Sequence, residues 1–240
     1  GIDCALWDLE ARIRRQPVHL LAGLPAPGPV LTCYTLSLDE PDVMASLAVR
    51  HLDKPLLKLK LGGGAKDALR MRAVRAARPD VRLVADANES WSEADLERLM
   101  AVAAETGVEL IEQPLPAGKD DALGRASRPV PVCADESAHT AQDLPLLKGR
   151  YDAVNIKLDK TGGLTEGLEM LSAAHRLGFR TMIGCMVSTS LAMAPAHLLA
   201  QQADFADIDG PLLLARDRAP GLDYGTGSLV SSCAGLWGGI

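Results

Sequence analysis

Three acidic residues each follow a short apolar run, at the point where a buried strand would stop. Asp86, Glu112 and Asp135 end the segments 83–86, 110–112 and 132–135. Their spacing corresponds to about one strand–helix unit each, so parallel strands would carry them to neighbouring ends of one sheet. Three carboxylates held that close repel one another unless a cation neutralises them, and an all-oxygen set suits Mg²⁺. For any single acid, a helix cap or a solvated loop carboxylate is the alternative.

Two lysines alternate within the apolar run 56–61. Lys58 and Lys60 share one face of a strand, because alternate strand residues point the same way. They face water if only the leucine face is buried. If they face a site instead, they lie ~6.5 Å apart along the strand, and at an effective dielectric of about 20 their repulsion is about 2.5 kcal/mol. That repulsion lowers a lysine pKa toward the range useful to a general base.

A third lysine, Lys157, ends the apolar run 153–157. In a ring of eight parallel strands it would lie opposite Lys60. One amine could then remove a proton from a carbon acid while the other delivers a proton from the opposite face, which is the arrangement needed for epimerisation or racemisation. The alternative is a surface lysine at a strand end.

These residues depend on a regular alternation of strands and helices. The sequence predicts strands near 30–37, 56–61, 82–85, 109–112, 131–134, 153–157, 180–184 and 205–208. It predicts helices at 1–15, 41–51, 65–77, 92–106, 120–127, 141–148, 164–177 and 190–201. Short apolar strands that alternate with helices indicate parallel strands covered on both faces, and eight of them favour an α/β fold of the TIM-type (β/α)8 barrel class. A doubly wound open sheet is the alternative.

The glycine-rich segments carry no nucleotide-binding signature. No G-x-G-x-x-G motif opens a predicted helix, and the segment 62–64 lacks the lysine of a phosphate-binding loop, so we expect a flexible loop there. The segment after residue 210 is rich in glycine and proline, and we expect it to wrap around the end of the barrel.

Composition excludes several classes of protein. A net charge of −6 without a basic cluster argues against a nucleic-acid partner, and no apolar run has transmembrane length, so no membrane partner is expected. The five cysteines (4, 33, 133, 185 and 233) have no C-x-x-C spacing and an odd count, which indicates reduced thiols in a cytoplasmic protein.

Several motifs, taken in order, cover nearly the whole chain and resemble the muconate-lactonising subgroup of the enolase superfamily. The motifs are Lys58-x-Lys60, Asp86-Ala87-Asn88, Glu112-Gln113-Pro114, Ala134-Asp135-Glu136-Ser137 and Asn155-Ile156-Lys157. The segments 34–37, 155–164, 184–186 and 206–211 are more narrowly similar to L-Ala-D/L-Glu (dipeptide) epimerases. The resemblance implies the modified (β/α)7β barrel of the superfamily.

The resemblance also implies a role for each residue of the metal and acid–base set. Asp86, Glu112 and Asp135 would bind one Mg²⁺ per subunit, which holds the substrate carboxylate and stabilises an enediolate. Lys60 and Lys157 would be the two acid–base residues of a 1,1-proton transfer.

Other residues would bind the substrate. Lys58 would lower the pKa of Lys60 and contact the substrate carboxylate. Asp207 and Asp209 would hold the free α-ammonium of a dipeptide by charge-assisted hydrogen bonds. Thr35 and the backbone near Cys185 would line the pocket. Some relatives carry Glu where this chain has Ser188, so no role is assigned to that position.

The resemblance divides the chain into two parts. Residues 1–27 resemble the helix and linker that follow an N-terminal capping domain, and residues 28–240 correspond to the barrel. We therefore expect the capping domain to be absent from this chain, through truncation or because the domain is supplied otherwise. The expected protein is a cytoplasmic homo-oligomer that acts in the recycling of cell-wall peptides.

The expected function is that of a Mg²⁺-dependent dipeptide epimerase. An N-acylamino acid racemase and an o-succinylbenzoate synthase of the same subgroup are alternatives, and neither needs an acidic pair at Asp207 and Asp209. A catalytically inactive barrel kept for binding or assembly is the alternative outside the enzymes.

Overall fold

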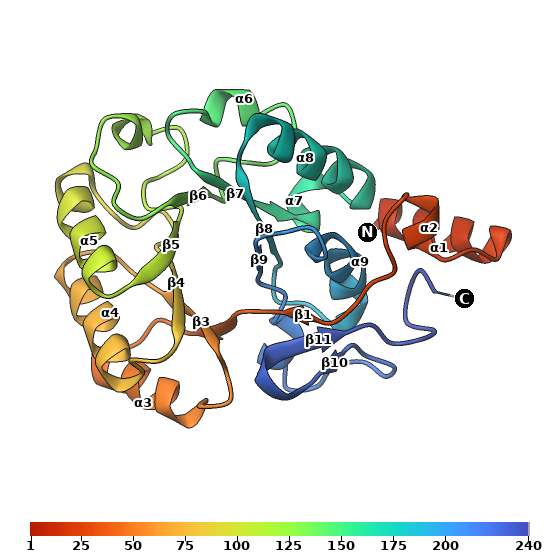
Figure 1. Cartoon of the computed structure of the whole chain (residues 1–240), viewed down its shortest axis with the longest axis horizontal. Helices are drawn as coiled ribbons and strands as arrows, with labels where there is room; N and C mark the ends of the chain where they lie inside the picture. Colours follow the sequence, from red (N-terminus) through yellow and green to blue (C-terminus); the bar gives the residue numbers. More distant parts are fainter. Residues whose placement is uncertain (240) are drawn as a thin grey trace. The chain divides into compact units, whose positions relative to one another are not determined.

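The computed structural model describes residues 1–239 of the chain. Its α-helices are α1 (Ile2–Arg14), α2 (Val18–Leu21), α3 (Pro41–Arg50), α4 (Ala65–Ala77), α5 (Glu93–Glu105), α6 (Leu144–Leu147), α7 (Leu158–Thr161), α8 (Leu164–Leu177) and α9 (Ser190–Ala200). Three 3-10 turns accompany them, η1 (Asp121–Gly124), η2 (Gly210–Leu213) and η3 (Thr226–Ser228). The helices alternate with strands for most of the chain (Figure 1).

The strands form two sheets. The strands are β1 (Val30–Leu31), β2 (Tyr34–Leu36), β3 (Leu56–Lys60), β4 (Arg82–Asp86), β5 (Val108–Glu112), β6 (Val132–Ala134), β7 (Ala153–Lys157), β8 (Arg180–Gly184), β9 (Phe205–Ala206), β10 (Asp223–Tyr224) and β11 (Leu229–Ser231). The larger sheet has eight strands in the order β2 to β9. Its pairs β2–β3, β3–β4, β4–β5, β5–β6, β6–β7 and β8–β9 are parallel. A doubly wound sheet reverses its strand order, so the strictly sequential order here excludes that alternative.

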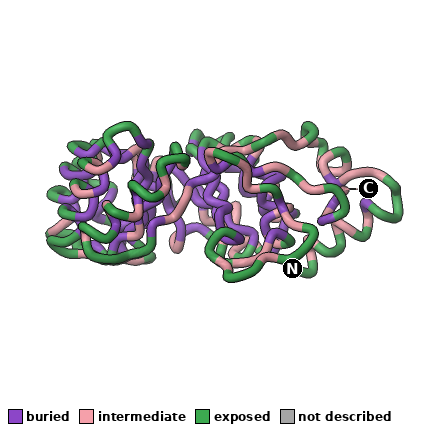
Figure 2. Tube along the Cα trace, turned by 90° about the horizontal axis from the view of Figure 1, so that it is seen from below, coloured by how far each residue is buried: buried purple, intermediate pink, exposed green. Residues whose placement is uncertain are grey.

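The chain divides into two compact units, which we name the central unit (residues 33–138 and 143–154) and the terminal unit (residues 1–32, 139–142 and 155–239). In the central unit α4 packs between α3 and α5, and these helices cover β3 to β5 (Figure 1). The helix α5 begins at a capped end, because the Ser92 side chain accepts a hydrogen bond from the Asp95 amide. Buried residues follow the strands, whereas exposed residues follow the outer helix faces and loops (Figure 2).

In the terminal unit α8 packs against α1, α7 and α9. Its second sheet is small and antiparallel, with the strand order β1-β11-β10. Thr32, which lies between β1 and β2, forms a parallel bridge with Ala206 of β9. The terminal unit therefore joins the start of the chain to its last strands.

Five predicted elements differ from the structure. The strand expected over 30–37 is split into β1 and β2, which belong to different sheets. The helices expected over 120–127 and 141–148 shrink to η1 and α6, and the strand over 205–208 ends at Ala206. The segment after 210 contributes β10 and β11 instead of only wrapping an end. Distant residues supply hydrogen-bond partners in two of these segments, since the Thr32 amide donates to the Ser228 carbonyl and the Ala141 amide donates to the Glu166 carboxylate.

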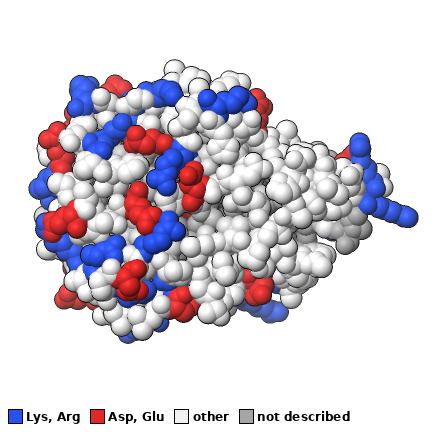
Figure 3. Space-filling model, in the orientation of Figure 1, with Lys and Arg blue, Asp and Glu red and all other residues white. Residues whose placement is uncertain are grey.

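The charged residues of the surface are mixed in sign. The face drawn in Figure 3 carries lysines and arginines beside aspartates and glutamates. Elsewhere the surface also carries ion pairs, such as the exposed pair of Arg72 with Glu105. Within residues 1–239, the helices are too short or too polar to cross a membrane.

Candidate active site

Lys58 is a buried cation in the middle of β3. Its side chain is only 2% exposed, and its Nζ lies 2.6 Å from Glu112 Oε2 and 3.1 Å from Asp86 Oδ2. Both faces of β3 are covered, since Leu57 and Leu59 are also fully buried. The alternative in which Lys58 faces water is therefore wrong, and its ammonium pairs with the two strand-end carboxylates.

Lys60 ends the same strand and reaches the same carboxylate. Its Nζ lies 2.6 Å from Asp86 Oδ2 and 3.2 Å from Asn88 Oδ1, and its side chain is 31% exposed. Lys58 and Lys60 thus converge on one oxygen of Asp86 from one face of β3, as their alternation predicts. Lys60 is the more accessible of the two amines.

The strand register explains why these groups meet. Lys60 is the register partner of Asp86, and Asp86 is the register partner of Glu112, so the three residues end adjacent parallel strands. Asp135 follows β6, the next strand, and is 2% exposed. The prediction that Asp86, Glu112 and Asp135 belong to three consecutive strands is confirmed, because they stand at the ends of β4, β5 and β6, the third, fourth and fifth strands of the eight-stranded sheet.

Charge balance keeps Asp86 ionised. Burial by itself raises the pKa of the Asp86 carboxyl, but the positive charges of Lys58 and Lys60 outweigh burial and hold that pKa below its ordinary value. A buried carboxylate of this kind requires cations beside it. The strand ends of the central unit are therefore a preformed site where positive and negative charges meet.

Asp86 contacts the ammonium groups of Lys58 and Lys60, and Glu112 contacts that of Lys58. Within residues 1–239, the structure contains no group of three or more His, Cys, Asp and Glu side chains assembled around a metal position. Asp86 and Glu112 direct oxygens at Lys58 instead. The three carboxylates are the oxygen-rich donor set that a hard divalent cation prefers.

Thr35 lies beside this cluster in the sheet. It occupies the middle of β2 and is the register partner of Lys58.

The loop that follows Lys60 was expected to be flexible, but buried Asp67 accepts hydrogen bonds from the amides of Gly62 at 3.1 Å and Gly63 at 2.8 Å. Asp67 also accepts from the Trp91 indole at 2.9 Å, so the amides at the start of this loop are held in place.

The remaining predicted residues lie in the terminal unit. Lys157 ends β7 and is 7% exposed, while Asp207 and Asp209 follow β9 and are buried. The alternative of a surface lysine at 157 is therefore wrong. The pairing of Lys157 with Lys60 about one substrate carbon stays a prediction.

The segment that carries the two aspartates is fixed through the residue between them. The Ile208 amide donates to Thr32 Oγ1 at 2.9 Å, and the Ile208 carbonyl accepts from the Tyr224 hydroxyl at 2.6 Å. Thr32 is fully buried, and Tyr224 comes from β10. Asp207 and Asp209 are thus clamped at their shared neighbour by two neutral hydroxyls.

Close packing also links Cys185 to the residue after Asp209. A Cβ on Gly210 would lie 3.0 Å from the Met186 carbonyl oxygen and 3.3 Å from Cys185 Sγ, which leaves no room for a larger residue without displacement. The segments that contain Cys185 and Asp209 therefore pack directly against each other within the terminal unit.

Sequence reasoning missed the side chains that support these groups. Gln113, named above only as part of the Glu112-Gln113-Pro114 motif, is fully buried and donates hydrogen bonds to Ser137 and Tyr151. Tyr151 and Tyr224 were not singled out. The position of Gln113 directly after Glu112 was the available signal, whereas the tyrosines have no local pattern that marks them.

The chain matches a family model described as enolase C-terminal domain-like over residues 44–216. It is 46% identical over 240 residues to an N-acetyl-D-glutamate racemase of Pseudoalteromonas sp., covering 100% of this chain and 75% of that protein. It is 47% identical over 231 residues to the L-Ala-D/L-Glu epimerase of Escherichia coli (strain K12), covering 95% of this chain and 72% of that protein.

Solved structures agree with these relatives. An enolase family member from Agrobacterium tumefaciens with homology to dipeptide epimerases, solved with sodium and L-Ala-L-Glu, has a TM-score of 0.95 and 55% identity over 98% of this chain and 72% of that chain. A dipeptide epimerase from Enterococcus faecalis, complexed with Mg and L-Leu-L-Tyr, has a TM-score of 0.90 and 34% identity over 98% and 71%. The predicted fold class is thereby confirmed, and the chain belongs to the enolase C-terminal domain-like family.

Proposed function

We propose that this chain is the barrel part of a Mg²⁺-dependent dipeptide epimerase, an isomerase that inverts the α-carbon of one amino acid. The observation that carries the proposal is the cluster of Lys58 and Lys60 on the strand-end carboxylates Asp86 and Glu112. The 47% identity to the Escherichia coli L-Ala-D/L-Glu epimerase supports the same reaction.

The proposed metal site consists of Asp86, Glu112 and Asp135. The donor set fits Mg²⁺, because it is all oxygen, because its carboxylates end three consecutive strands, and because each of them is buried. When bound, Mg²⁺ would neutralise the substrate carboxylate and stabilise the negative charge that develops as the α-proton leaves. The Mg-bound dipeptide epimerase of Enterococcus faecalis supports this choice of metal.

The proton transfers are assigned to two lysines. Lys60 Nζ would take the α-proton of one epimer, and Lys157 Nζ would deliver a proton to the opposite side of the same carbon; the roles exchange for the other epimer. Lys58 lies on the same face of β3 as Lys60 and contacts both Asp86 and Glu112.

The substrate would be held at its amine by the terminal unit. Asp207 and Asp209 would accept hydrogen bonds from the free α-ammonium of the dipeptide, with Thr35 and the backbone near Cys185 lining the pocket. The crystal structure of the Agrobacterium tumefaciens protein with bound L-Ala-L-Glu supports a dipeptide of alanine and glutamate as the first substrate to test.

Exchange of the substrate α-proton tests the proposal directly. L-Ala-L-Glu incubated in D₂O with the chain and Mg²⁺ should lose its glutamate α-proton signal in NMR, and EDTA should stop the loss. Lys60→Ala should abolish exchange from one epimer and Lys157→Ala from the other. Exchange that continues with both epimers in either variant would contradict the two-lysine assignment, and absence of any Mg²⁺-dependent exchange would favour an inactive barrel.

Racemisation of an N-acylated glutamate is the second candidate, because the Pseudoalteromonas relative is named for N-acetyl-D-glutamate. An N-acetyl group carries no positive charge, so it gains nothing from an aspartate pair. Asp209→Asn should raise the KM for L-Ala-L-Glu about tenfold or more and leave that for N-acetylglutamate nearly unchanged. A preference of the unmodified chain for N-acetylglutamate would favour the second candidate.

The wider setting is also a proposal. We extend the proposal to a role in the recycling of cell-wall peptides, in the cytoplasm, by a homo-oligomer. Light scattering of the purified chain would give the number of subunits.

A further inference from the structure

Gln113 links the ends of two adjacent strands through its side-chain amide. It follows Glu112 directly with a φ of 35°, an uncommon backbone conformation for a residue other than glycine. Its Oε1 accepts from the amide of Asp135 at 2.8 Å and from the amide of Ser137 at 3.2 Å. One side chain therefore connects the residue after Glu112 to the backbone of Asp135.

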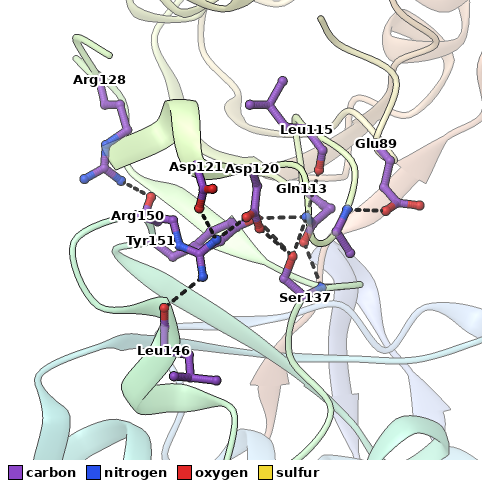
Figure 4. Close-up of polar contacts among 11 residues, drawn as sticks. Glu89, Gln113, Leu115, Asp120, Asp121, Arg128, Ser137, Leu146, Arg150 and Tyr151 are labelled. Carbon is purple, nitrogen blue, oxygen red and sulfur yellow. Dashed lines mark hydrogen bonds and ion pairs between the residues drawn. The ribbon is translucent and has the colours of Figure 1, made fainter. Parts of the chain in front are cut away.

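The other end of the Gln113 amide is held by three oxygens. Its Nε2 lies 2.9 Å from the Leu115 carbonyl, 2.9 Å from Ser137 Oγ and 2.9 Å from the Tyr151 hydroxyl (Figure 4). Acceptors surround Nε2 and donors face Oε1, so the amide has one favourable orientation. A flipped amide would place Nε2 against two N–H donors and Oε1 among three oxygen atoms.

A buried carboxylate determines which way the two hydroxyls point. Tyr151 donates to Asp120 Oδ2 at 2.6 Å, and Ser137 donates to the same oxygen at 2.8 Å. Because both hydroxyl protons are directed at Asp120, the lone pairs of both oxygens are left for Gln113. Burial and the hydrogen bond to Asp120 raise the pKa of Tyr151, so the hydroxyl stays a donor.

Asp120 is itself anchored by charge. Arg150 donates to Asp120 Oδ1 and to the Leu146 carbonyl, the latter at 2.8 Å (Figure 4). Asp120 stands just before η1, the 3-10 turn that replaces the helix expected over 120–127. This connection between β5 and β6 therefore brings the Asp120 carboxylate within hydrogen-bond distance of Ser137 and Tyr151.

We propose that Asp120 and Tyr151 are positioning residues that act through Gln113 to set the distance between Glu112 and Asp135. The proposal rests on the proposed function, because it treats those two carboxylates as ligands of Mg²⁺. Gln113 accepts a hydrogen bond from the backbone amide of Asp135, one proposed ligand, and is the next residue in the chain after Glu112, the other.

Mg²⁺ affinity measured without substrate tests the inference. Titration calorimetry of the whole chain should show that Tyr151→Phe, which removes one hydroxyl and keeps the ring, weakens Mg²⁺ binding about tenfold. Asp120→Asn, which keeps the side-chain volume, should weaken it as well and serves if Tyr151→Phe does not fold. A thermal unfolding curve of each variant, recorded without Mg²⁺, gives its unfolding temperature, and the titrations are run far below that temperature.

Tyr34→Phe is the matched control. It removes the same atom from a half-buried tyrosine of the central unit, whose hydroxyl lies 3.1 Å from His51 Nε2 and outside the network. Its Mg²⁺ affinity should equal that of the unmodified chain. An unchanged affinity in folded Tyr151→Phe and Asp120→Asn would overturn the inference and leave the proposed function intact. A lack of Mg²⁺ binding by the unmodified chain would overturn both.

A double-mutant cycle checks the route through Gln113. If Tyr151 acts through that amide, Gln113→Met should lower Mg²⁺ affinity by itself, and adding Tyr151→Phe should cause no further loss. Additive losses would mean that Tyr151 reaches the site independently, which overturns the assigned route.

Discussion

The two units hold their acidic residues in different ways. In the central unit Asp86 and Glu112 are buried against the ammonium group of Lys58, so charge is balanced by charge. In the terminal unit the segment of Asp207 and Asp209 is fixed at Ile208 by the hydroxyls of Thr32 and Tyr224. The comparison teaches that the first site depends on the ionisation of its neighbours, whereas the second segment depends on the geometry of neutral hydrogen bonds.

Removal of the buried ammonium should have the largest effect. Lys58→Met leaves two buried carboxylates without their shared cation, and breaking a buried ion pair on one side costs about 3–5 kcal/mol. We therefore expect the free energy of unfolding in urea to fall by about 3 kcal/mol without Mg²⁺, with part of the loss restored by Mg²⁺. A loss below about 1 kcal/mol would show that the carboxylates are not held by this charge.

Acidification should affect the terminal unit through a histidine. Burial lowers the pKa of His197 more than its hydrogen bonds to the backbone of Val230 and Gly28 raise it. The unfolded chain then binds a proton that the folded chain does not, so this contribution to stability is complete above about pH 6.5 and is lost as the pH falls toward the folded pKa.

Replacement of that histidine provides the measurement. The free energy of unfolding should decrease between pH 7 and pH 5 in the unmodified chain, and His197→Gln should reduce this slope. The same slope in both proteins would remove His197 as its source.

A single hydroxyl should have a smaller, more specific effect. Tyr224→Phe removes the hydrogen bond to the Ile208 carbonyl, which is worth about 1 kcal/mol. We expect the KM for L-Ala-L-Glu to rise several-fold with little change in kcat, because Asp207 and Asp209, which we propose bind the amine, are held less firmly. An equal rise for N-acetylglutamate would argue that the clamp does not act through amine binding.

Replacement of an exposed lysine should cause the smallest loss in the free energy of unfolding. Lys66 pairs with Glu40 at 2.6 Å, but both side chains are more than half exposed. Lys66→Met makes the same substitution as Lys58→Met in the same unit, and surface pairs contribute less than about 1 kcal/mol. The ratio of the two losses measures how much burial strengthens a lysine–carboxylate pair here. Similar losses would contradict the contrast between buried and exposed charge.

The strand-end residues could be predicted because their signals are local. Apolar runs that end in Asp86, Glu112 or Lys157 place those residues at the ends of strands, and the alternation of strands with helices makes these the carboxyl ends of parallel strands. The alternation of Lys58 and Lys60 likewise determines that they share a face. Both features follow from the period and direction of a strand.

The supporting contacts could not be predicted in the same way. Gln113 meets Tyr151, and Tyr224 meets Ile208, only after separate segments have packed. Nothing in the spacing of a lone tyrosine indicates which carbonyl or amide it will reach. The helix expected over 120–127 failed for a related reason, since Asp120 is bound by Tyr151 and Arg150 from outside its own segment.

The sequence by itself determined the alternation of elements and the residue types at the strand ends, because these depend on periodicity and on chain direction. Only the tertiary structure decided the order of the strands in the sheet and which groups contact the strand-end residues. Lys58 became a buried partner of Glu112 instead of a surface lysine, and β10 brought Tyr224 to Ile208. The physical reason is that hydrogen bonds and ion pairs depend on distances of about 3 Å, which packing sets and spacing along the chain does not.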